Sequence, residues 1–322
     1  MEVRELRLQT GLSQSKFAKM FDIPVSTLKD WEQERRNPPV YVINMMRTIL
    51  QYKGMLISQS YVDACDTRRK SVENAMAIML SATNGPDELF LEVLDSYIFG
   101  KITLEEMEAG IDRFEIQKVF AKLLGLDVKP TRIAYTYDVE HIVSIHKYLF
   151  GDIYEWAGTF RKENLYKSER VLSGGSAEYA DYHEIEERLK KLLQRYADFD
   201  WTNTEKMGDE ISDFLLELWS IHPFREGNTR TCITFLWHYL KGKGIDFQVA
   251  LLRNNPMYVR DSLVMANYDQ KEYLKRIISD AVQGKVQESG YFVNDEQAGE
   301  QYKIAKADYN AFREKYSIKQ DL

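Results

Sequence analysis

The sequence predicts a mostly α-helical fold, with one β-hairpin as the expected exception. Near the N-terminus, apolar residues recur at helical spacing at Phe17, Met20 and Phe21. Two longer apolar runs, residues 214–221 and 233–237, have the composition of buried helices. We expect four parts: residues 1–52, a helical region with a linker at 53–128, a larger helical core at 129–286, and a charged helix or tail at 287–322.

Composition places the chain among ordinary water-soluble proteins. Its 322 residues are enough for two or three domains, and 44% of them are hydrophobic. No apolar run approaches the roughly 20 residues that span a bilayer, and the N-terminus is charged rather than signal-like. Cys65 and Cys232 provide neither a disulfide framework nor a metal cluster. We therefore expect a cytoplasmic protein without a membrane partner.

The first fifty residues divide into short helices with clear boundary signals. Gly11 ends the first helix, and Ser13 is suited to cap the second. Residues 22–24 form a short turn, and the pair Pro38–Pro39 stops the third helix. We expect helices at residues 4–8, 14–21, 26–34 and 42–50.

This arrangement resembles a Cro/repressor-type helix-turn-helix module. In such modules the third helix lies in the major groove and contacts base edges, while nearby groups contact phosphates. Residues 1–50 carry eight Lys and Arg against six Asp and Glu, so the predicted DNA operator rests on the pattern rather than on charge. The alternative is a helical scaffold that does not bind DNA. The expected contacts are Ser26, Thr27, Lys29 and Gln33 for bases, and Gln14, Arg35 and Arg36 for phosphates.

The most informative segment runs from His222 to Arg230, between the two long apolar runs. Gly227 and Asn228 allow a tight turn whose backbone can approach a ligand closely. A helix that begins near Asn228 would point its free N–H groups, and the positive end of its dipole, at that ligand. The segment therefore predicts a phosphate site.

Residues 222–230 read HPFREGNTR and resemble the signature of the Fic family, HPFx(D/E)GN(G/K)R. Eight of the nine positions fit, and Thr229 is the departure. The resemblance extends over about residues 135–285. It includes residues 146–158, which are similar to the segment before the flap of the family, and residues 258–264, which are similar to a helix after its site.

The resemblance implies that the chain moves AMP from ATP onto a Tyr, Thr or Ser hydroxyl of a target protein. His222 is then the base that accepts the hydroxyl proton, and Glu226 holds Mg²⁺ together with phosphate oxygens. The remaining positions are expected to bind phosphate: Gly227, Asn228 and Thr229 through backbone N–H groups, the Asn228 amide as a further donor, and Arg230 through its guanidinium fork.

Residues 164–180 are similar to the flap that aligns the target backbone in Fic proteins. The segment Ser173, Gly174, Gly175 and Ser176 is expected to form its hairpin tip, and a simple surface loop is the alternative. We expect only packing roles for four other histidines and for the aromatic cluster beside one of them: His141, His146, His183 and His238, with Tyr148, Phe150, Tyr154 and Trp156.

One position departs from the family in a way that affects function. Many Fic proteins carry a second arginine where this chain has Ile233, and some are inhibited by a helix with the pattern (S/T)xxxE(G/N). Residues 67–112 weakly resemble that inhibitory region, but the corresponding stretch 78–83 lacks the pattern, and the match at 159–164 is fortuitous. We expect this region to pack against the core or to cover the site, and a glutamate at Ala82 to have little effect.

Two functions remain open on the sequence. The first is a protein adenylyltransferase fused to a DNA-binding module, as in toxin–antitoxin or stress regulation. The second is a transcriptional regulator whose Fic-like domain senses nucleotide without turnover. The target protein, the preferred nucleotide and the operator are not fixed by the sequence, and a homodimer stays an open alternative.

Overall fold

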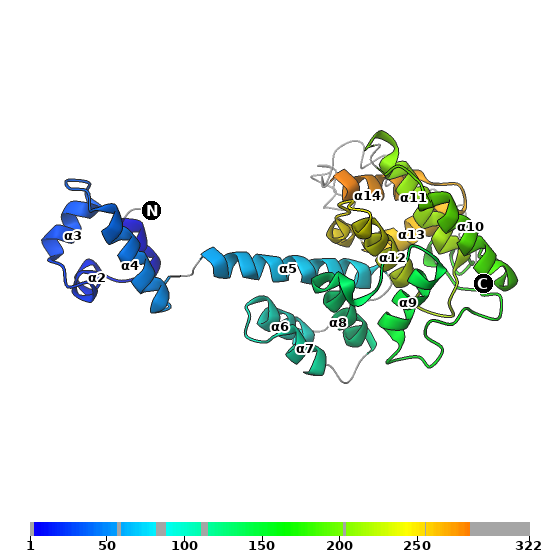
Figure 1. Cartoon of the computed structure of the whole chain (residues 1–322), viewed down its shortest axis with the longest axis horizontal. Coiled ribbons are helices and arrows are strands. Elements are labelled where there is room, and N and C mark those ends of the chain that lie inside the picture. Colours follow the sequence, from blue (N-terminus) through cyan, green and yellow to red (C-terminus); the bar gives the residue numbers. More distant parts are fainter. Residues whose placement is uncertain are drawn as a thin grey trace, which may run out of the picture. The chain divides into compact units, whose positions relative to one another are not determined.

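The computed structural model describes residues 3–56, 59–81, 88–110, 115–201, 204–254 and 256–283. Within these ranges the regular structure is entirely helical (Figure 1). The chain divides into two compact units, residues 1–67 and 68–322. Ala82, where the sequence predicts that a glutamate would have little effect, and the tail at 287–322 lie outside the described residues.

The first unit is a small helical domain with its own core. Ser13 accepts a hydrogen bond from the Lys16 N–H and caps the second helix, and Gly11 ends the first with φ +67°. Phe17 and Leu28 are fully buried between the helices. Its helices are α1 (Val3–Thr10), α2 (Gln14–Met20), α3 (Val25–Glu32) and α4 (Val40–Tyr52).

The second unit contains the larger core. The long helix α5 (Gln59–Leu80) supplies buried residues such as Ala77 and Ile78 from its second half. Helices α6 (Glu88–Ile98) and α7 (Leu104–Gly110) pack in turn toward α8 (Glu115–Val128). The remaining helices are α9 (Val139–Phe150), α10 (Ile185–Ala197), α11 (Thr204–Ile221), α12 (Asn228–Gly242), α13 (Pro256–Asn267) and α14 (Glu272–Gln283).

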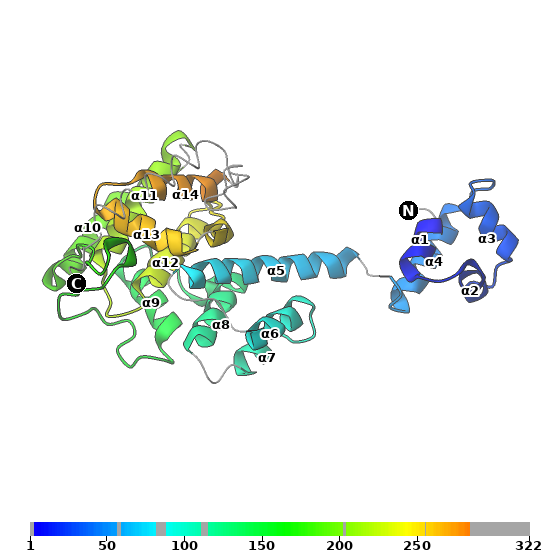
Figure 2. The same cartoon turned by 180° about the vertical axis from the view of Figure 1, so that it is seen from behind.

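Helix α12 is the centre of this unit, because every residue from 228 to 240 is buried. A helix that is covered all round must be enclosed by other elements. In both views α11, α13 and α14 lie on one side of α12, and α8 and α9 on the other (Figures 1 and 2). The predicted helices at 214–221 and 233–237 are confirmed as parts of α11 and α12. The helices packed around α12 therefore fix the position of its first turn.

The expected β-hairpin in residues 164–180 is not present, because no strand occurs among the residues that the structure describes. Residues 170–172 form a 3₁₀ turn, η2 (Arg170–Leu172), and Ser173 follows in the left-handed region with φ +49°. Hydrogen bonds join Glu169 N–H to Gly175 O (2.8 Å) and Gly174 N–H to Glu169 O (3.1 Å). A closed loop results, since this local turn replaces the strand pairing that a hairpin requires.

The described part of the second unit also contains short 3₁₀ segments. Three more 3₁₀ segments are η1 (Pro130–Arg132), η3 (Tyr182–Glu184) and η4 (Val249–Asn254). Helix α13 covers the stretch 258–264 that the sequence predicted to be helical. None of the helices in the described ranges is long and apolar enough to cross a membrane. The division into four parts at residues 52, 128 and 286 stays a prediction.

Candidate active site

The loop between α11 and α12 has a backbone that few other sequences could adopt. Gly227 is the N-cap of α12 with φ +78°, and a Cβ there would lie 2.5 Å from the Phe150 ring. His222 also has a positive φ, +50°, which is costly for a residue with a side chain. The Asn228 amide holds the loop closed, because it accepts from Phe224 N–H (2.8 Å) and donates to Phe224 O (2.7 Å).

The Asn228 amide thus uses its oxygen and one of its two N–H groups to hold the loop, and its role as a phosphate donor stays a prediction. Its backbone N–H remains at the first turn of α12, where N–H groups have no partner within the helix. The Thr229 hydroxyl is likewise occupied, because it accepts from the Trp219 indole N–H at 3.0 Å. Both side chains therefore help to fix the loop.

His222 is a neutral, buried imidazole. Only 2% of the residue is exposed, and its ring stacks on Tyr179 at 3.9 Å between centroids. The Nδ1 atom lies 3.1 Å from Trp219 O. Since a carbonyl can only accept, Nδ1 carries the proton and Nε2 keeps its lone pair. Burial, followed by the positive charge of Lys167, lowers the pKa of His222 well below its ordinary value.

Arg230 is buried with donors to spare. The residue is 6% exposed, and its guanidinium carbon lies 4.8 Å from the Phe150 ring centroid. Its Nη2 pairs with Glu115 of α8 at 3.2 Å, whereas Nε and Nη1 are buried without a hydrogen-bond partner. Unsatisfied buried donors are costly, and a phosphate oxygen that reached either of them would remove part of that cost. The guanidinium therefore fits a phosphate group.

Glu226 follows on the same loop and is partly exposed. Its carboxylate forms an ion pair with Lys167, which comes from the 164–180 segment. Within the described part of the chain, no group of three or more His, Cys, Asp or Glu side chains could hold a metal ion. Mg²⁺ commonly takes one or two carboxylates together with substrate phosphates, so Glu226 suits it only in combination with a nucleotide.

This site coincides with a match to known families. Residues 136–240 match the Fic/DOC family, and residues 3–51 match a helix-turn-helix family. The chain contains a Fic/DOC domain. The second match lies on the first compact unit, which therefore carries a helix-turn-helix domain.

Two curated relatives are named as enzymes. Protein adenylyltransferase VbhT of Bartonella schoenbuchensis is 30% identical over 140 residues, which cover 42% of this chain and 27% of VbhT. Probable protein adenylyltransferase y4lH of Sinorhizobium fredii is 36% identical over 103 residues, which cover 31% of this chain and 50% of y4lH. The chain thus spans between about a quarter and a half of the length of these relatives.

Two solved structures are similar at low identity. A Fic family protein from Desulfovibrio desulfuricans G20 aligns at 12% identity with a TM-score of 0.47, covering 81% of this chain and 78% of that one. The N-terminal Fic domain, with bound ADP, of a VirB-translocated Bep effector from Bartonella quintana aligns at 21% identity with a TM-score of 0.41. That alignment covers 52% of this chain and 82% of the other.

The remaining sequence-predicted positions of the Fic domain take different places. Ile233 is fully buried in α12, so the position of the second arginine carries an apolar core residue. In the 164–180 segment, Ser173 is exposed, the Gly174 carbonyl accepts from the Tyr166 hydroxyl, and the Ser176 hydroxyl accepts from Lys167 N–H. Residues 173–175 thus lie at the surface, and the hydrogen bonds of Gly174 and Ser176 hold them to residues 166 and 167 of the same segment.

The sequence did not identify two residues, His146 and Arg161, that contact the loop between α11 and α12 (residues 222–227). We expected His146 only to pack, but its Nε2 donates to Glu226 O at 3.1 Å while Gly158 N–H donates to its Nδ1 at 2.8 Å. Burial lowers the pKa of His146 to about 4, so it is a neutral spacer beneath Glu226. Arg161 donates to His222 O at 2.8 Å. Both residues are distant in sequence from the loop, so no local signal indicates these contacts, which form only when the chain folds.

Most of the side chains predicted to contact DNA are exposed on the helix-turn-helix domain, and these contacts stay predictions. Leu28 is buried and Trp31 packs against the core, so α3 turns its polar residues outward. Gln14 differs, because its amide donates to Glu32 at 2.7 Å, and Glu32 also pairs with Arg7 at 2.6 Å. A phosphate contact by Gln14 would require that network to open. The side chains that remain available are Ser26, Thr27, Lys29, Gln33, Arg35 and Arg36, of which Thr27 is half-buried.

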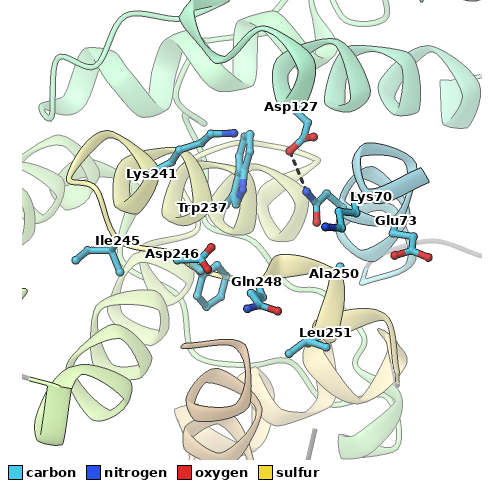
Figure 3. Close-up of a pocket in the computed structure, with 12 residues that line it drawn as sticks. Lys70, Glu73, Asp127, Trp237, Lys241, Ile245, Asp246, Gln248, Ala250 and Leu251 are labelled. Carbon is cyan, nitrogen blue, oxygen red and sulfur yellow. Dashed lines mark hydrogen bonds between the residues drawn. The ribbon is translucent and has the colours of Figure 1, made fainter. Parts of the chain in front are cut away.

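A cavity of about 630 Å³ lies elsewhere in the second unit (Figure 3). Its lining includes Lys70 and Asn74 of α5 and Trp237 and Lys241 near the C-terminal end of α12, and Asn74 donates to Asp127 at 3.0 Å. None of the predicted site residues lines this cavity. We therefore give it no role in the chemistry of the loop.

Proposed function

We propose that this protein is an adenylyltransferase that moves AMP from ATP to a hydroxyl group of a target protein. The single observation that carries the proposal is the occurrence, within nine residues, of a neutral base on the loop before α12 and an unsatisfied buried arginine in the first turn of that helix. His222 keeps its Nε2 lone pair, and Arg230 keeps two N–H groups without a partner. The similarity to VbhT and y4lH, which are named as adenylyltransferases, supports adenylyl rather than phosphoryl transfer.

In the proposed reaction, His222 Nε2 accepts the proton of the attacking Tyr, Thr or Ser hydroxyl. The hydroxyl oxygen forms a bond to the α-phosphorus, and the bond from that phosphorus to the bridging oxygen of the β-phosphate breaks. The products are the AMP-modified protein and pyrophosphate, and the proton on His222 passes to solvent. Tyr179, stacked on the imidazole, limits the directions from which a hydroxyl can approach.

The phosphate side of the reaction rests on two groups. The Nε and Nη1 atoms of Arg230 would donate to phosphate oxygens, and the first-turn N–H groups of α12 would add the positive end of the helix dipole. Glu226 and phosphate oxygens would hold Mg²⁺, which supplies charge neutralisation for the departing pyrophosphate. Since Lys167 pairs with Glu226, this ammonium group must move aside for a cation to bind there.

The helix-turn-helix domain would bind an operator and so couple the enzyme to transcription. The exposed residues Lys29, Arg35 and Arg36 supply the positive charge for this contact. The match of residues 3–51 to a helix-turn-helix family supports DNA binding in general. The operator sequence and the coupling itself belong to the proposal.

One observation favours a second function, a regulator that senses nucleotide without transferring it. Ile233 is fully buried and apolar, so a terminal phosphate would lack the second arginine that many Fic proteins provide. Nucleotide binding without transfer is the observation that would identify this function. The two functions differ in turnover, not in affinity.

The experiment compares His222→Ala with His183→Ala, a control histidine that is largely exposed. Purified variants are incubated with α-labelled ATP, Mg²⁺ and cell lysate, and ATP binding is measured in parallel by calorimetry. We expect labelled protein with the parent and with His183→Ala, and none with His222→Ala. ATP binding by the parent without any labelling would select the sensor.

A further inference from the structure

Arg161 is a buried arginine whose donors are all engaged. The residue is 2% exposed. Its Nε donates to His222 O at 2.8 Å, and its Nη2 donates to Ala180 O and, at 3.4 Å, to Ile221 O. Its Nη1 donates to Glu163 O at 2.8 Å and to the Asn164 side chain at 3.4 Å. A guanidinium has five N–H groups, so each has an acceptor.

These acceptors belong to two segments that are distant in sequence. Residues 221 and 222 are the end of α11 and the first residue of the loop that leads to α12, whereas residues 163, 164 and 180 lie at the two ends of the 164–180 segment. Two backbone hydrogen bonds join the same segments: Arg161 N–H donates to Pro223 O at 2.9 Å, and Ala180 N–H donates to Ser220 O at 3.1 Å. One side chain therefore joins both ends of the segment to the base.

A role confined to packing does not account for this arrangement. Burying a guanidinium without a carboxylate against it is costly, and apolar side chains fill such space at lower cost. The carbonyl that Arg161 Nε contacts belongs to His222, whose φ of +50° persists only if its surroundings hold it. The bond to His222 O fixes the peptide group next to the imidazole.

We infer that Arg161 is a positioning residue, which holds His222 and both ends of the 164–180 segment in one register so that a target hydroxyl meets Nε2. The inference rests on the proposed function and adds to it the group that sets the geometry between base and acceptor. Arg161 itself touches no reacting atom. Its effect is on the rate of transfer and not on the binding of nucleotide.

Asn164 extends the same connection at the surface. Its side-chain NH2 donates to Asp181 at 2.9 Å. Its side-chain oxygen Oδ1 accepts from Tyr182 N–H at 3.0 Å and also from Arg161. Because Asn164 is exposed, its replacement by alanine leaves the core intact. It provides a second way to loosen the two ends of the segment.

The test compares Arg161→Lys with Arg132→Lys, a control arginine that bonds Glu108 and Tyr148 away from the loop. Each variant is assayed for labelling of lysate protein with α-labelled ATP over a range of ATP concentrations. Lysine keeps the charge and loses the fork. A misplacement of about 1 Å costs on the order of 100-fold in rate, so we expect Arg161→Lys to lower the maximal rate by at least about tenfold. The KM for ATP should stay within about twofold of the parent, and Arg132→Lys should behave as the parent.

The outcomes are separable. A folded Arg161→Lys with the parental rate, or with a KM for ATP raised in step with the loss of rate, overturns the inference. If Arg161→Lys does not fold, Asn164→Ala decides the matter: a maximal rate lowered at least about threefold at unchanged KM supports the inference, and an unchanged rate overturns it. Failure of the parent to label any protein removes the proposed function itself and is seen before any variant is compared.

Discussion

Replacing Gly227 by alanine should be one of the most damaging single-methyl changes in the protein. A left-handed φ costs an L-residue about 1–2 kcal/mol, and Gly227 has φ +78°. The new Cβ would also lie 2.5 Å from two atoms of the Phe150 ring, and such overpacking costs about 1–3 kcal/mol more. The free energy of unfolding of the second unit should therefore fall by about 2–5 kcal/mol.

Gly244 offers a matched control within the same unit. Its φ is +77°, and nothing lies within 4 Å of the position of its Cβ. Gly244→Ala should therefore lose only the backbone part, about 1–2 kcal/mol. The difference between the two variants isolates the contact with Phe150.

Urea unfolding provides the measurement, followed by the fluorescence of a variant in which Trp219, buried beside the loop, is the one tryptophan that remains. The transition that contains this signal should move to lower urea in both variants, and further in Gly227→Ala. Because Gly227 also sets the start of α12, that variant should lose protein labelling. Equal losses of stability in Gly227→Ala and Gly244→Ala would refute the steric part of the reasoning.

Three other predictions follow from single contacts. The pKa of His222 is lowered by burial and by Lys167, so transfer should decline with falling pH only below about pH 6.5, the ordinary histidine value; Lys167→Met should move this acid limb of the pH–rate profile to higher pH, and a limb above pH 6.5 in the parent would contradict the assignment. Glu115 competes with phosphate for Arg230, and a pair of this exposure is worth about 0.2–1 kcal/mol, so Glu115→Gln should tighten ATP binding by up to about fivefold in calorimetry; weaker binding would show that Glu115 assists the nucleotide. Arg35→Ala and Arg36→Ala should each weaken binding to a DNA fragment from the chain's own promoter and reduce the salt slope by about one, whereas salt-independent binding would remove the DNA contact.

Local signals predicted the framework of the site well. Ser13 as a cap, Gly11 as a helix end and Gly227 before a new helix are each decided by the backbone within a few residues. The long apolar runs around residues 222–230 identified α11 and α12 because buried helices leave a strong pattern. The sequence therefore located the loop and the helix that carries Arg230.

Contacts between distant residues were beyond the sequence. Glu115 pairs with Arg230, and Lys167 pairs with Glu226, across separations that no local pattern encodes. The same is true of Arg161, whose five acceptors lie on two segments. Such partners are set by how the helices pack, and a lone charged residue in a sequence does not indicate its partner.

Polar side chains assigned to ligands were the least predictable. The amides of Asn228 and Gln14 each form hydrogen bonds within the protein, with the Phe224 backbone and with Glu32, and their ligand contacts stay predictions. A short amide beside a tight turn satisfies the local backbone first, because an unpaired buried N–H or C=O is expensive. The hairpin expected around Ser173 failed for a related reason, since a 3₁₀ turn and one left-handed residue close that loop locally.

The position of the label tests the central claim most directly. The parent protein is incubated with Mg²⁺ and lysate in two reactions, one with ATP labelled on the α-phosphate and one with ATP labelled on the γ-phosphate. If His222 and Arg230 carry out AMP transfer, the α-label appears on a Tyr, Thr or Ser side chain of a protein and the γ-label leaves with pyrophosphate. Protein labelled from the γ-phosphate, or from neither, would contradict the account.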